Sequence, residues 1–349
     1  MYEPNFRMTP ELMRLVVQAT ELKIWIGQAV VDVPWLTILQ REAAVRLAHS
    51  STAIEGNPLT LPEVEALARG ENIVASSKAK QEALNYLGAM RCIWTRKVSG
   101  PVEEKDLLCL HKLLTQKTLS KENVGRYKIR QNRVVDAKGI TVYTPPLPKE
   151  VRPLTQNLLS WVNSKGSKKL HPMITSAIAH HRLVSIHPFS DGNGRTARAL
   201  GILLLYIRGF DTHHLFALDE YFEQDRNRYY LKIQQARDLD DDLSYWLEYV
   251  AQGIVQTLNR TKERILSLQV PSKGSRIILT KRQEDFLRFL RDRGRVRSPD
   301  LEKAFKLTRS RINQILKPLV DAGLVIQEGQ TRATTYHLLP LAKNMKMGR

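Results

Sequence analysis

Apolar residues recur at helical spacing along most of the first 270 positions, which predicts a mainly α-helical chain. Cap and stop signals, such as Thr60 before one segment and Gly70 after it, divide this pattern into separate helices. The helices expected in this way cover residues 9–30, 36–54, 60–69, 77–97, 103–116, 148–163, 172–186, 195–208, 221–237 and 242–269. No apolar run is long enough to span a bilayer, so we expect no membrane partner.

One stretch departs from the helical pattern. Within residues 125–146, two runs rich in strand-forming side chains, at 133–135 and 140–143, flank the turn sequence Asp-Ala-Lys-Gly. Strand formers on either side of a turn are typical of a β-hairpin. We therefore predict a hairpin over about residues 133–143.

The last part of the chain has a different composition. Residues 270–275 resemble a linker, and residues 273–349 hold 18 Lys and Arg against 7 Asp and Glu, so +11 of the formal net charge of +19 lies there. Helical patterns at 282–293, 299–305 and 309–322, followed by strand patterns from 323 and over 333–338, predict a winged helix-turn-helix domain over residues 276–340.

This domain type has two common uses. In DNA-binding versions the third helix enters the major groove. The residues suited to that role here are Arg309, Arg311, Asn313 and Gln314. The same fold also serves as a protein-interaction module, so the sequence leaves DNA and protein open as partners of this domain.

Composition adds the cellular setting. A net charge of +19 favours a polyanionic partner such as a nucleotide, a nucleic acid or an acidic protein face. The two cysteines, Cys92 and Cys109, form neither a metal-ligand pattern nor a disulfide framework. We therefore expect a cytoplasmic protein.

The densest chemistry lies in residues 187–198, which read HPFSDGNGRTAR. Pro188 ends the preceding helix, and Gly192 and Gly194 permit backbone angles that other residues avoid. A new helix then begins near Arg195. Backbone N–H groups of such a loop converge on an anion, and the helix dipole strengthens that attraction.

The side chains of the loop complete this inventory. His187 has an ordinary pKa near enough to neutrality to accept a proton, and Asp191 can hold a hard divalent cation. Arg195 and Arg198 are three positions apart and share one helix face beside the anion. A phosphoryl- or nucleotidyl-transfer site needs these groups, and the residues alone do not distinguish the two reactions.

The loop resembles the signature of the Fic family, His-x-Phe-x-Asp/Glu-Gly-Asn-Gly-Arg-x-x-Arg, at every fixed position. The resemblance covers roughly residues 35–265 and implies a helical Fic core with a β-hairpin flap. It implies a protein adenylyltransferase that moves AMP from ATP to a Ser, Thr or Tyr hydroxyl of a protein, self-modification included. ATP would be the substrate, with Mg²⁺ or Mn²⁺ as the metal.

The resemblance also implies roles for particular residues. His187 would deprotonate the target hydroxyl, Phe189 would anchor the loop, and Asp191 would bind the metal. Arg195 and Arg198 would hold the β- and γ-phosphates. The nucleotide-binding residues expected in this way are Asp191, Gly192, Asn193 (also through its side chain), Gly194, Arg195, Thr196, Ala197 and Arg198, the flap residues Ile140, Thr141, Val142 and Tyr143, and the adenine-pocket candidates Tyr229 and Tyr230. Ordinary aromatic packing is the alternative for the two tyrosines.

A second family motif lies earlier in the chain. Ser51, Glu55 and Gly56 match the Ser/Thr-x-x-x-Glu-Gly/Asn pattern of an inhibitory helix, here over about residues 41–56. The resemblance implies that Glu55 pairs with Arg198 and keeps it from the γ-phosphate. In some relatives a glutamate at this place also supports removal of AMP, and the sequence does not separate the two roles.

The expected domain plan has an N-terminal helical region at 1–110, a Fic core at 111–270 and the winged domain at 276–340. One alternative is a DNA-binding regulator whose Fic core senses a nucleotide without catalysis. Another is transfer of UMP, phosphate or phosphocholine. The target protein, the signal that relieves inhibition and the oligomeric state, with a homodimer as one candidate, stay open.

Overall fold

The computed structural model describes residues 2–30, 36–96, 100–135, 138–268, 280–321, 324–329 and 334–338. These residues are mainly helical, and their sheets are small and antiparallel, so the expected fold class is confirmed. The chain divides into two compact units. One comprises residues 1–27 and 40–261, and the other comprises residues 28–39 and 262–349. None of the described helices is long and apolar enough to cross a membrane.

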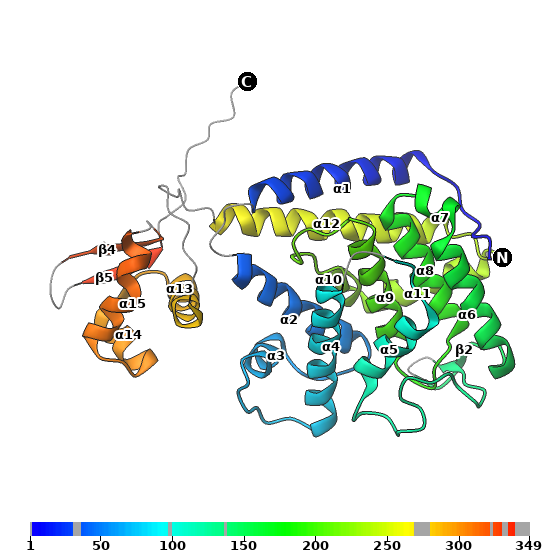
Figure 1. The fold of residues 1–349 in the computed structure, drawn as a ribbon, viewed down its shortest axis with the longest axis horizontal. Coiled ribbons are helices and arrows are strands. Elements are labelled where there is room, and N and C mark those ends of the chain that lie inside the picture. The colour runs from blue at the N-terminus through cyan, green and yellow to red at the C-terminus, as the bar shows by residue number, and fades with distance from the viewer. Residues whose placement is uncertain are drawn as a thin grey trace. The chain divides into compact units, whose positions relative to one another are not determined.

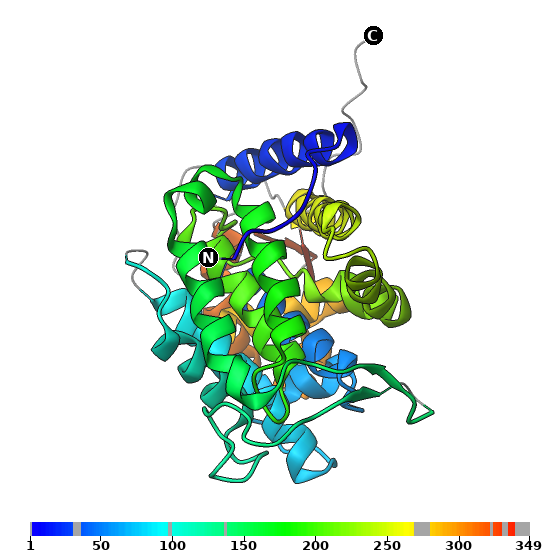
Figure 2. The ribbon, with the colours of Figure 1, turned by 90° about the vertical axis from the view of Figure 1, so that its right-hand side faces the viewer.

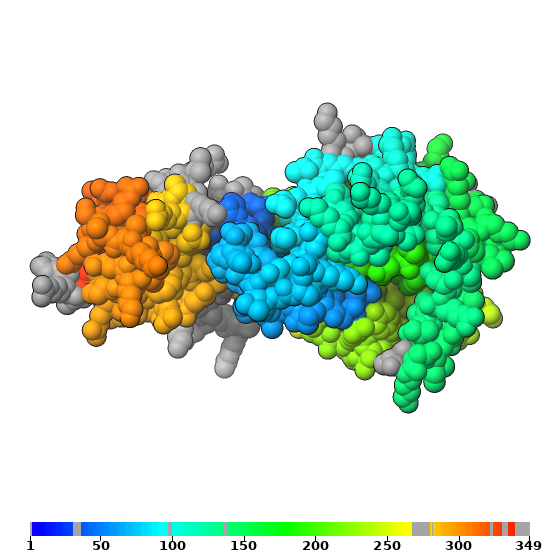
Figure 3. All heavy atoms as spheres, turned by 90° about the horizontal axis from the view of Figure 1, so that it is seen from below, coloured from blue at the N-terminus to red at the C-terminus, as the bar shows by residue number. Residues whose placement is uncertain are grey.

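The first unit consists mostly of helices (Figure 1). The helices that lie wholly or mostly in it are α1 (Pro10–Ala29), α2 (Leu36–Ile54), α3 (Leu61–Ala68), α4 (Ser77–Thr95), α5 (Glu104–Thr115), α6 (Pro148–Asn163), α7 (Lys165–Lys169), α8 (Pro172–Ile186), α9 (Asn193–Ile207), α10 (Asp219–Gln224), α11 (Arg226–Asp238) and α12 (Ser244–Leu268). Most bounds lie within two residues of the predicted ones. Seen from below, α3 to α5 (blue to cyan) cover much of one face of this unit (Figure 3).

The predicted single helix at 221–237 is wrong in one respect. The structure has two helices there, α10 and α11, which meet at Asp225. The backbone of Asp225 is not helical, with φ −137°, and its carboxylate accepts a hydrogen bond from the N–H of Arg228. A side-chain cap of this kind starts a new helix. The short helix α7 is also present without having been predicted.

Helices α8 and α9 pack against each other in the middle of the first unit (Figure 1). Nearly every residue of both helices is buried, which is typical of helices surrounded by others. The loop that joins them contains residues 187–192. Because both of its ends are fixed in the core, this loop is held more rigidly than an ordinary surface connection.

The predicted hairpin is present, although its strands are short. Strand β1 (Val134–Val135) pairs antiparallel with β2 (Thr141–Tyr143), with Val134 opposite Tyr143 and an irregularity after it. The hairpin projects from the helices (Figure 2). Exposed apolar side chains, including Val135, Ile140 and Val142, lie along it.

The second unit contains three helices among its described residues after position 279: α13 (Lys281–Arg293), α14 (Ser298–Phe305) and α15 (Arg309–Asp321). Its sheet has the order β3 (Val296–Arg297), β5 (Thr335–Leu338), β4 (Val325–Glu328), all antiparallel. Strand β3 was not predicted. The apolar stripe of α15, namely Ile312, Ile315, Leu316 and Leu319, is buried. The name winged helix-turn-helix and the predicted domain bounds stay predictions.

Candidate active site

His187 lies at the point where α8 ends. Its backbone is left-handed, with φ 51°, and its N–H donates to the carbonyl of Leu183 at 3.0 Å. The next residue, Pro188, cannot continue the helix, so the chain turns here. A positive φ at a residue other than glycine is uncommon and is often found at functional sites.

The imidazole of His187 is in the form that a general base needs. Its Nδ1 lies 3.3 Å from the carbonyl oxygen of Val184, which can only accept, so Nδ1 carries the proton and Nε2 is left to accept one. Burial, together with the nearby charges of Lys128 and Arg237, lowers the pKa of His187 to about 4, although the hydrogen bond to Val184 and the charge of Glu55 act in the opposite direction. The ring is therefore neutral at physiological pH.

Lys128 and Arg237 were not identified from the sequence. The Nζ of the buried Lys128 donates to Asn132 Oδ1 at 2.7 Å, and its backbone N–H donates to the carbonyl of Pro188 at 2.9 Å. The guanidinium of Arg237 lies 3.7 Å from the ring centre of Tyr143. Neither residue belongs to a recognisable motif, and their only signal was proximity in sequence to the predicted hairpin or adenine pocket.

The loop is braced from within by its own asparagine. Asn193 Oδ1 accepts from the N–H of Phe189, and Asn193 Nδ2 donates to the carbonyl of Phe189, both at 2.9 Å. Phe189 is fully buried, in agreement with its expected anchoring role. The expected contact between the Asn193 side chain and phosphate stays a prediction, because in this structure the amide is bonded to the loop itself.

The loop is also held from outside, by His111 on α5. The ring of His111 stacks on Phe189 with centroids 3.8 Å apart and an angle of 3°. Its Nδ1 accepts from the N–H of Gly125 at 3.0 Å, so its Nε2 carries the proton and donates to the carbonyl of Asp191 at 3.0 Å. Burial lowers the pKa of His111 to about 4, which keeps this arrangement neutral. Sequence reasoning missed His111, which was one apolar-face residue of a predicted helix.

Arg198 is completely enclosed and bound by the end of α2. Its Nη2 donates to Glu55 Oε1 and to the carbonyl of Ser51, and its Nε donates to Ser51 Oγ, each at 2.8 Å. The side chain of Arg198 has no exposed surface, whereas that of Glu55 is 30% exposed. The structure thus brings together the two ends of the contact that the inhibitory motif implied.

The carboxylate of Glu55 also lies directly over the loop. A methyl group built on Gly194 would collide with Glu55 Oε1, so the carboxylate would have to move away from the position that it occupies here. Gly194 is in the first turn of α9, where free N–H groups and the helix dipole attract negative charge. A carboxylate therefore occupies the position at which the sequence predicts a phosphate.

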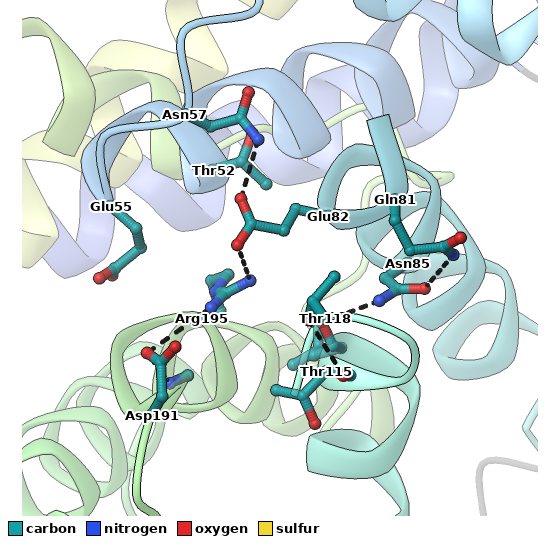
Figure 4. Close-up of polar contacts among 12 residues, drawn as sticks. Thr52, Glu55, Asn57, Gln81, Glu82, Asn85, Thr115, Thr118, Asp191 and Arg195 are labelled. Atoms are coloured by element: carbon teal, nitrogen blue, oxygen red, sulfur yellow. Dashed lines mark hydrogen bonds and ion pairs between the residues drawn. The ribbon is translucent and has the colours of Figure 1, made fainter. Parts of the chain in front are cut away.

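Asp191 and Arg195 lie on the other side of the loop (Figure 4). The carboxylate of Asp191 is half exposed, accepts from the N–H of Gly192 at 2.6 Å and lies 3.8 Å from Arg195 Nη2. Within the described ranges, no group of three or more His, Cys, Asp or Glu could hold a metal ion. A metal here would have Asp191 as its protein ligand and would need phosphate and water for the rest, as Mg²⁺ often does.

Gly192, Thr196 and Ala197 support the loop from inside. A methyl on Gly192, whose φ is +76°, would come within 2.8 Å of Thr115 Cγ2. Thr196 Oγ1 donates to the carbonyl of Gly192 at 2.7 Å, and both Thr196 and Ala197 are fully buried. Any contact between these residues and a nucleotide would therefore run through their backbone.

The two adenine-pocket candidates lie in different surroundings. Tyr229 is buried among Phe222 and Trp246, and its hydroxyl is 2.9 Å from His180 Nε2. Tyr230 is partly exposed, and its hydroxyl donates to the carbonyl of Ile54, one residue before Glu55, at 3.3 Å. Of the two, Tyr230 is the more exposed, and a contact of either with adenine stays a prediction.

The hairpin is fastened to α8 by its last residue. The hydroxyl of Tyr143 donates to the carbonyl of Ser185 at 2.8 Å, two positions before His187. Thr141 and its neighbours Ile140 and Val142 are exposed. Of the four predicted flap residues, Tyr143 therefore anchors the hairpin, whereas the other three are exposed.

Comparisons with known proteins agree with this fold. Residues 101–205 match the family model described as the Fic/DOC family. The recognition of the Fic family from the 187–198 loop is therefore confirmed.

Among curated proteins, the chain is similar to the protein adenylyltransferase Fic of Drosophila yakuba, with 29% identity over 260 residues, 68% of this chain and 50% of the relative. The corresponding protein of Nematostella vectensis is 30% identical over 227 residues, 63% of this chain and 49% of the relative. The chain thus spans about half the length of these curated relatives.

Solved structures support the fold. A Fic family protein from Desulfovibrio desulfuricans G20 has a TM-score of 0.67 and 24% identity and covers 99% of this chain and 100% of its own. Fic-1 from C. elegans (aa134–508) has a TM-score of 0.60 and 25% identity, with 72% of this chain and 71% of its own covered.

Proposed function

We propose that this protein is an adenylyltransferase that moves AMP from ATP to a protein hydroxyl and that Glu55 keeps it inhibited. One observation carries the proposal: beside the neutral base His187, the carboxylate of Glu55 lies on both Arg198 and Gly194, where a phosphate would bind. The names of the similar curated proteins support the same reaction.

His187 acts as the general base in this reaction. Its Nε2 takes the proton from the target hydroxyl as that oxygen attacks the α-phosphorus of ATP. A new P–O bond to the target forms, the bond to the β-phosphate oxygen breaks, and pyrophosphate leaves with the released electron pair. Arg195, Arg198 and the N–H groups at the start of α9 stabilise the phosphate charge.

Asp191 is the residue that would hold Mg²⁺ or Mn²⁺. Its half-exposed carboxylate at the loop fits a cation that takes one protein ligand and shares phosphate oxygens with the substrate. When bound, such an ion supplies positive charge beside the phosphates. The remaining steps depend on the side chains of the loop.

The inhibition is a competition between two anions for one site. While Glu55 pairs with Arg198, that guanidinium cannot hold a phosphate, and the carboxylate repels one from the start of α9. Glu55 lies at the end of α2, next to Gly56 with φ +89°, and is partly exposed. Its side chain can therefore leave the loop without unfolding a buried segment.

The hairpin is the proposed contact for the protein target, which includes another molecule of this enzyme in self-modification. Exposed apolar side chains at Ile140 and Val142 and exposed backbone offer an edge to which an extended segment can pair. Removal of AMP from a modified target is a further proposed role of Glu55, since its partly exposed carboxylate can orient a water.

We further propose that the second unit is a winged helix-turn-helix domain that contacts DNA through α15. Arg311, Asn313 and Gln314 are exposed on this helix, and Arg311 Nη1 donates to Gln314 Oε1 at 2.9 Å. Asn313 Oδ1 accepts from the hydroxyl of Tyr336 at 3.0 Å, which ties α15 to β5.

The test of the reaction uses ATP labelled on the α- or on the γ-phosphate with the Glu55→Gly variant. AMP transfer labels protein only from α-labelled ATP. Labelling of protein from γ-labelled ATP alone would show that the protein transfers phosphate and not AMP. Tight ATP binding with no label from either would favour a regulator that senses a nucleotide.

A further inference from the structure

A second carboxylate, that of Glu82 on α4, contacts the other arginine of the loop. Glu82 Oε1 lies 3.3 Å from Arg195 Nη1, and the side chains of Arg195 and Glu82 are only 4% and 13% exposed. Neither the sequence motifs nor the reaction described above uses Glu82. Figure 4 shows it between Arg195 and the segment that follows α2.

The other oxygen of Glu82 is bound to that segment. Asn57 Nδ2 donates to Glu82 Oε2 at 2.9 Å and to the carbonyl of Ala79 at 3.0 Å, while Asn57 Oδ1 accepts from the N–H of Leu59 at 3.1 Å. Asn57 is thus fixed on three sides, two residues after Glu55. The amide holds Glu82 in one orientation, so the carboxylate cannot easily follow a moving arginine.

Arg195 lies between two carboxylates, and Glu82 is the nearer one. The distance from Arg195 Nη2 to Asp191 Oδ1 is 3.8 Å, against 3.3 Å from Nη1 to Glu82. Without the charge of Glu82, the buried guanidinium would turn towards Asp191, because a buried cation needs a counter-charge. Arg195 would then neutralise the metal-binding carboxylate and turn away from a phosphate in the loop.

Helix α4 supports the second arginine as well. One turn after Glu82, the hydroxyl of Tyr86 donates to Asp219 Oδ2 at 2.7 Å, and Asp219 Oδ2 lies 3.8 Å from Arg198 Nε. The same face of α4 therefore leads to both arginines of α9. Among the described residues, Nε and Nη1 of Arg195 have no hydrogen-bond partner, so Glu82 holds this arginine by charge without using up its donors.

We propose that Glu82 is a positioning residue, which orients Arg195 for a nucleotide phosphate and connects it through Asn57 to the segment that bears Glu55. The proposal rests on the proposed function only in that a nucleotide phosphate binds in the loop. Binding of a phosphate to Arg195 and the position of the inhibitory segment are then linked through one carboxylate and one amide.

The experiment measures calorimetric binding of ATP and of adenosine to the full chain carrying Glu55→Gly, with and without Glu82→Gln. Glutamine keeps the shape and an oxygen for Asn57 but removes the charge. We expect the Kd for ATP to rise about tenfold, the size expected for loss of a well-placed charge contact. The Kd for adenosine should stay the same, because adenosine has no phosphate.

Three further variants make the result specific. Glu65→Gln removes an exposed carboxylate 3.8 Å from Arg69 on α3 and should leave both Kd values unchanged. In an Arg195→Ala background, Glu82→Gln should have no further effect on ATP, because Glu82 acts through Arg195. If Glu82→Gln lowers the yield of folded protein, Glu82→Asp replaces it. This variant keeps the charge on a shorter side chain, so we expect its Kd for ATP to lie between that of the Glu82 protein and the roughly tenfold higher value expected for Glu82→Gln.

The opposite results overturn the proposal. An unchanged or lower Kd for ATP would make Glu82 a bystander or a competitor for Arg195. An equal loss for adenosine and ATP would show a general structural role. If Glu82→Gln weakens ATP binding but Glu55→Gly labels no protein from α-labelled ATP, the positioning role stands and AMP transfer fails.

Discussion

At the scale of single residues, the main feature of the site is the position of one negative charge, the carboxylate of Glu55. Glu55 lies over Gly194 and on Arg198, in the position suited to a phosphate. The absence of a side chain at Gly194 is what makes this position available to either anion. The proposed base, His187, is neutral, and the carboxylate of Glu55 fills the proposed phosphate position.

A methyl group at Gly194 should therefore obstruct the ligand as well as the inhibitor. We expect Glu55→Gly/Gly194→Ala to bind ATP at least about tenfold more weakly than Glu55→Gly, since the added carbon occupies the anion position. Calorimetric titration with ATP measures this, with Gly27→Ala on α1, where an added methyl would meet nothing within 4 Å, as a control remote from the loop. Equal ATP affinity in the two variants would mean that phosphate binds elsewhere.

The pKa of His187 predicts an unusual pH profile. The base must be neutral to act, so activity falls as pH falls through its pKa, which burial lowers to about 4. Because Glu55 raises that pKa, its removal lowers the value further. We expect AMP transfer by Glu55→Gly to stay constant from pH 7.5 down to about pH 5. A midpoint near 6.5, with the fold intact by circular dichroism, would show an exposed histidine instead.

At the scale of elements, the loop is positioned by helices that are distant in sequence. Helix α5 contributes His111 beneath Phe189, α4 contributes Glu82 to Arg195, and the end of α2 contributes Glu55 to Arg198. The residues of the loop follow one another in sequence, whereas the side chains that contact them come from three other helices. The contacts from α4 and α5 hold the loop in place. Movement of the end of α2 would change the contact between Glu55 and Arg198.

The support from α5 can be measured as stability. His111→Ala removes a stacked ring and two hydrogen bonds to the backbone, so we expect the free energy of unfolding to fall by about 2–4 kcal/mol. Urea titration followed by circular dichroism measures it. Lys112→Ala, an exposed change on the same helix, should cost less than about 0.5 kcal/mol. Equal effects of the two changes would mean that His111 does not hold the loop.

The sequence predicted features formed by consecutive residues, and it did not predict contacts between residues that are far apart in the chain. Helix periods and caps gave most helices to within two residues, and the loop 187–198 could be recognised because its residues are consecutive. The break at Asp225 was missed because a capping aspartate also occurs inside helices. Glu82 and His111 were missed because each was one polar residue in an amphipathic pattern, and only packing shows what it contacts.

At the scale of the whole molecule, charge is unevenly distributed along the chain. Residues 273–349 hold 18 basic and 7 acidic residues, so this segment favours a polyanion irrespective of the chemistry in the first unit. The two compact units thus allow a catalytic and a binding function to reside in one chain. Whether the second unit binds DNA is a separate question from AMP transfer.

The DNA proposal predicts binding that depends on salt. We expect the full chain to bind duplex DNA at low ionic strength, with affinity falling steeply as salt rises. Arg311→Ala should weaken this binding and reduce the slope of log K against log salt by about 1, while the exposed Lys78→Ala should not. Fluorescence anisotropy measures both. An affinity for duplex DNA that does not change with salt, or no binding to any duplex, would favour a protein partner for the second unit.

The proposed function requires that Glu55 inhibits an AMP transferase whose base is His187. The most direct test is incorporation of α-labelled ATP into protein by wild type, Glu55→Gly and Glu55→Gly/His187→Ala. We expect labelling by Glu55→Gly to exceed that of wild type by at least about 100-fold, because misalignment of a reacting group by about 1 Å can cost that much, and the double variant to be inactive. Equal labelling by wild type and Glu55→Gly, or labelling that persists without His187, would contradict the account.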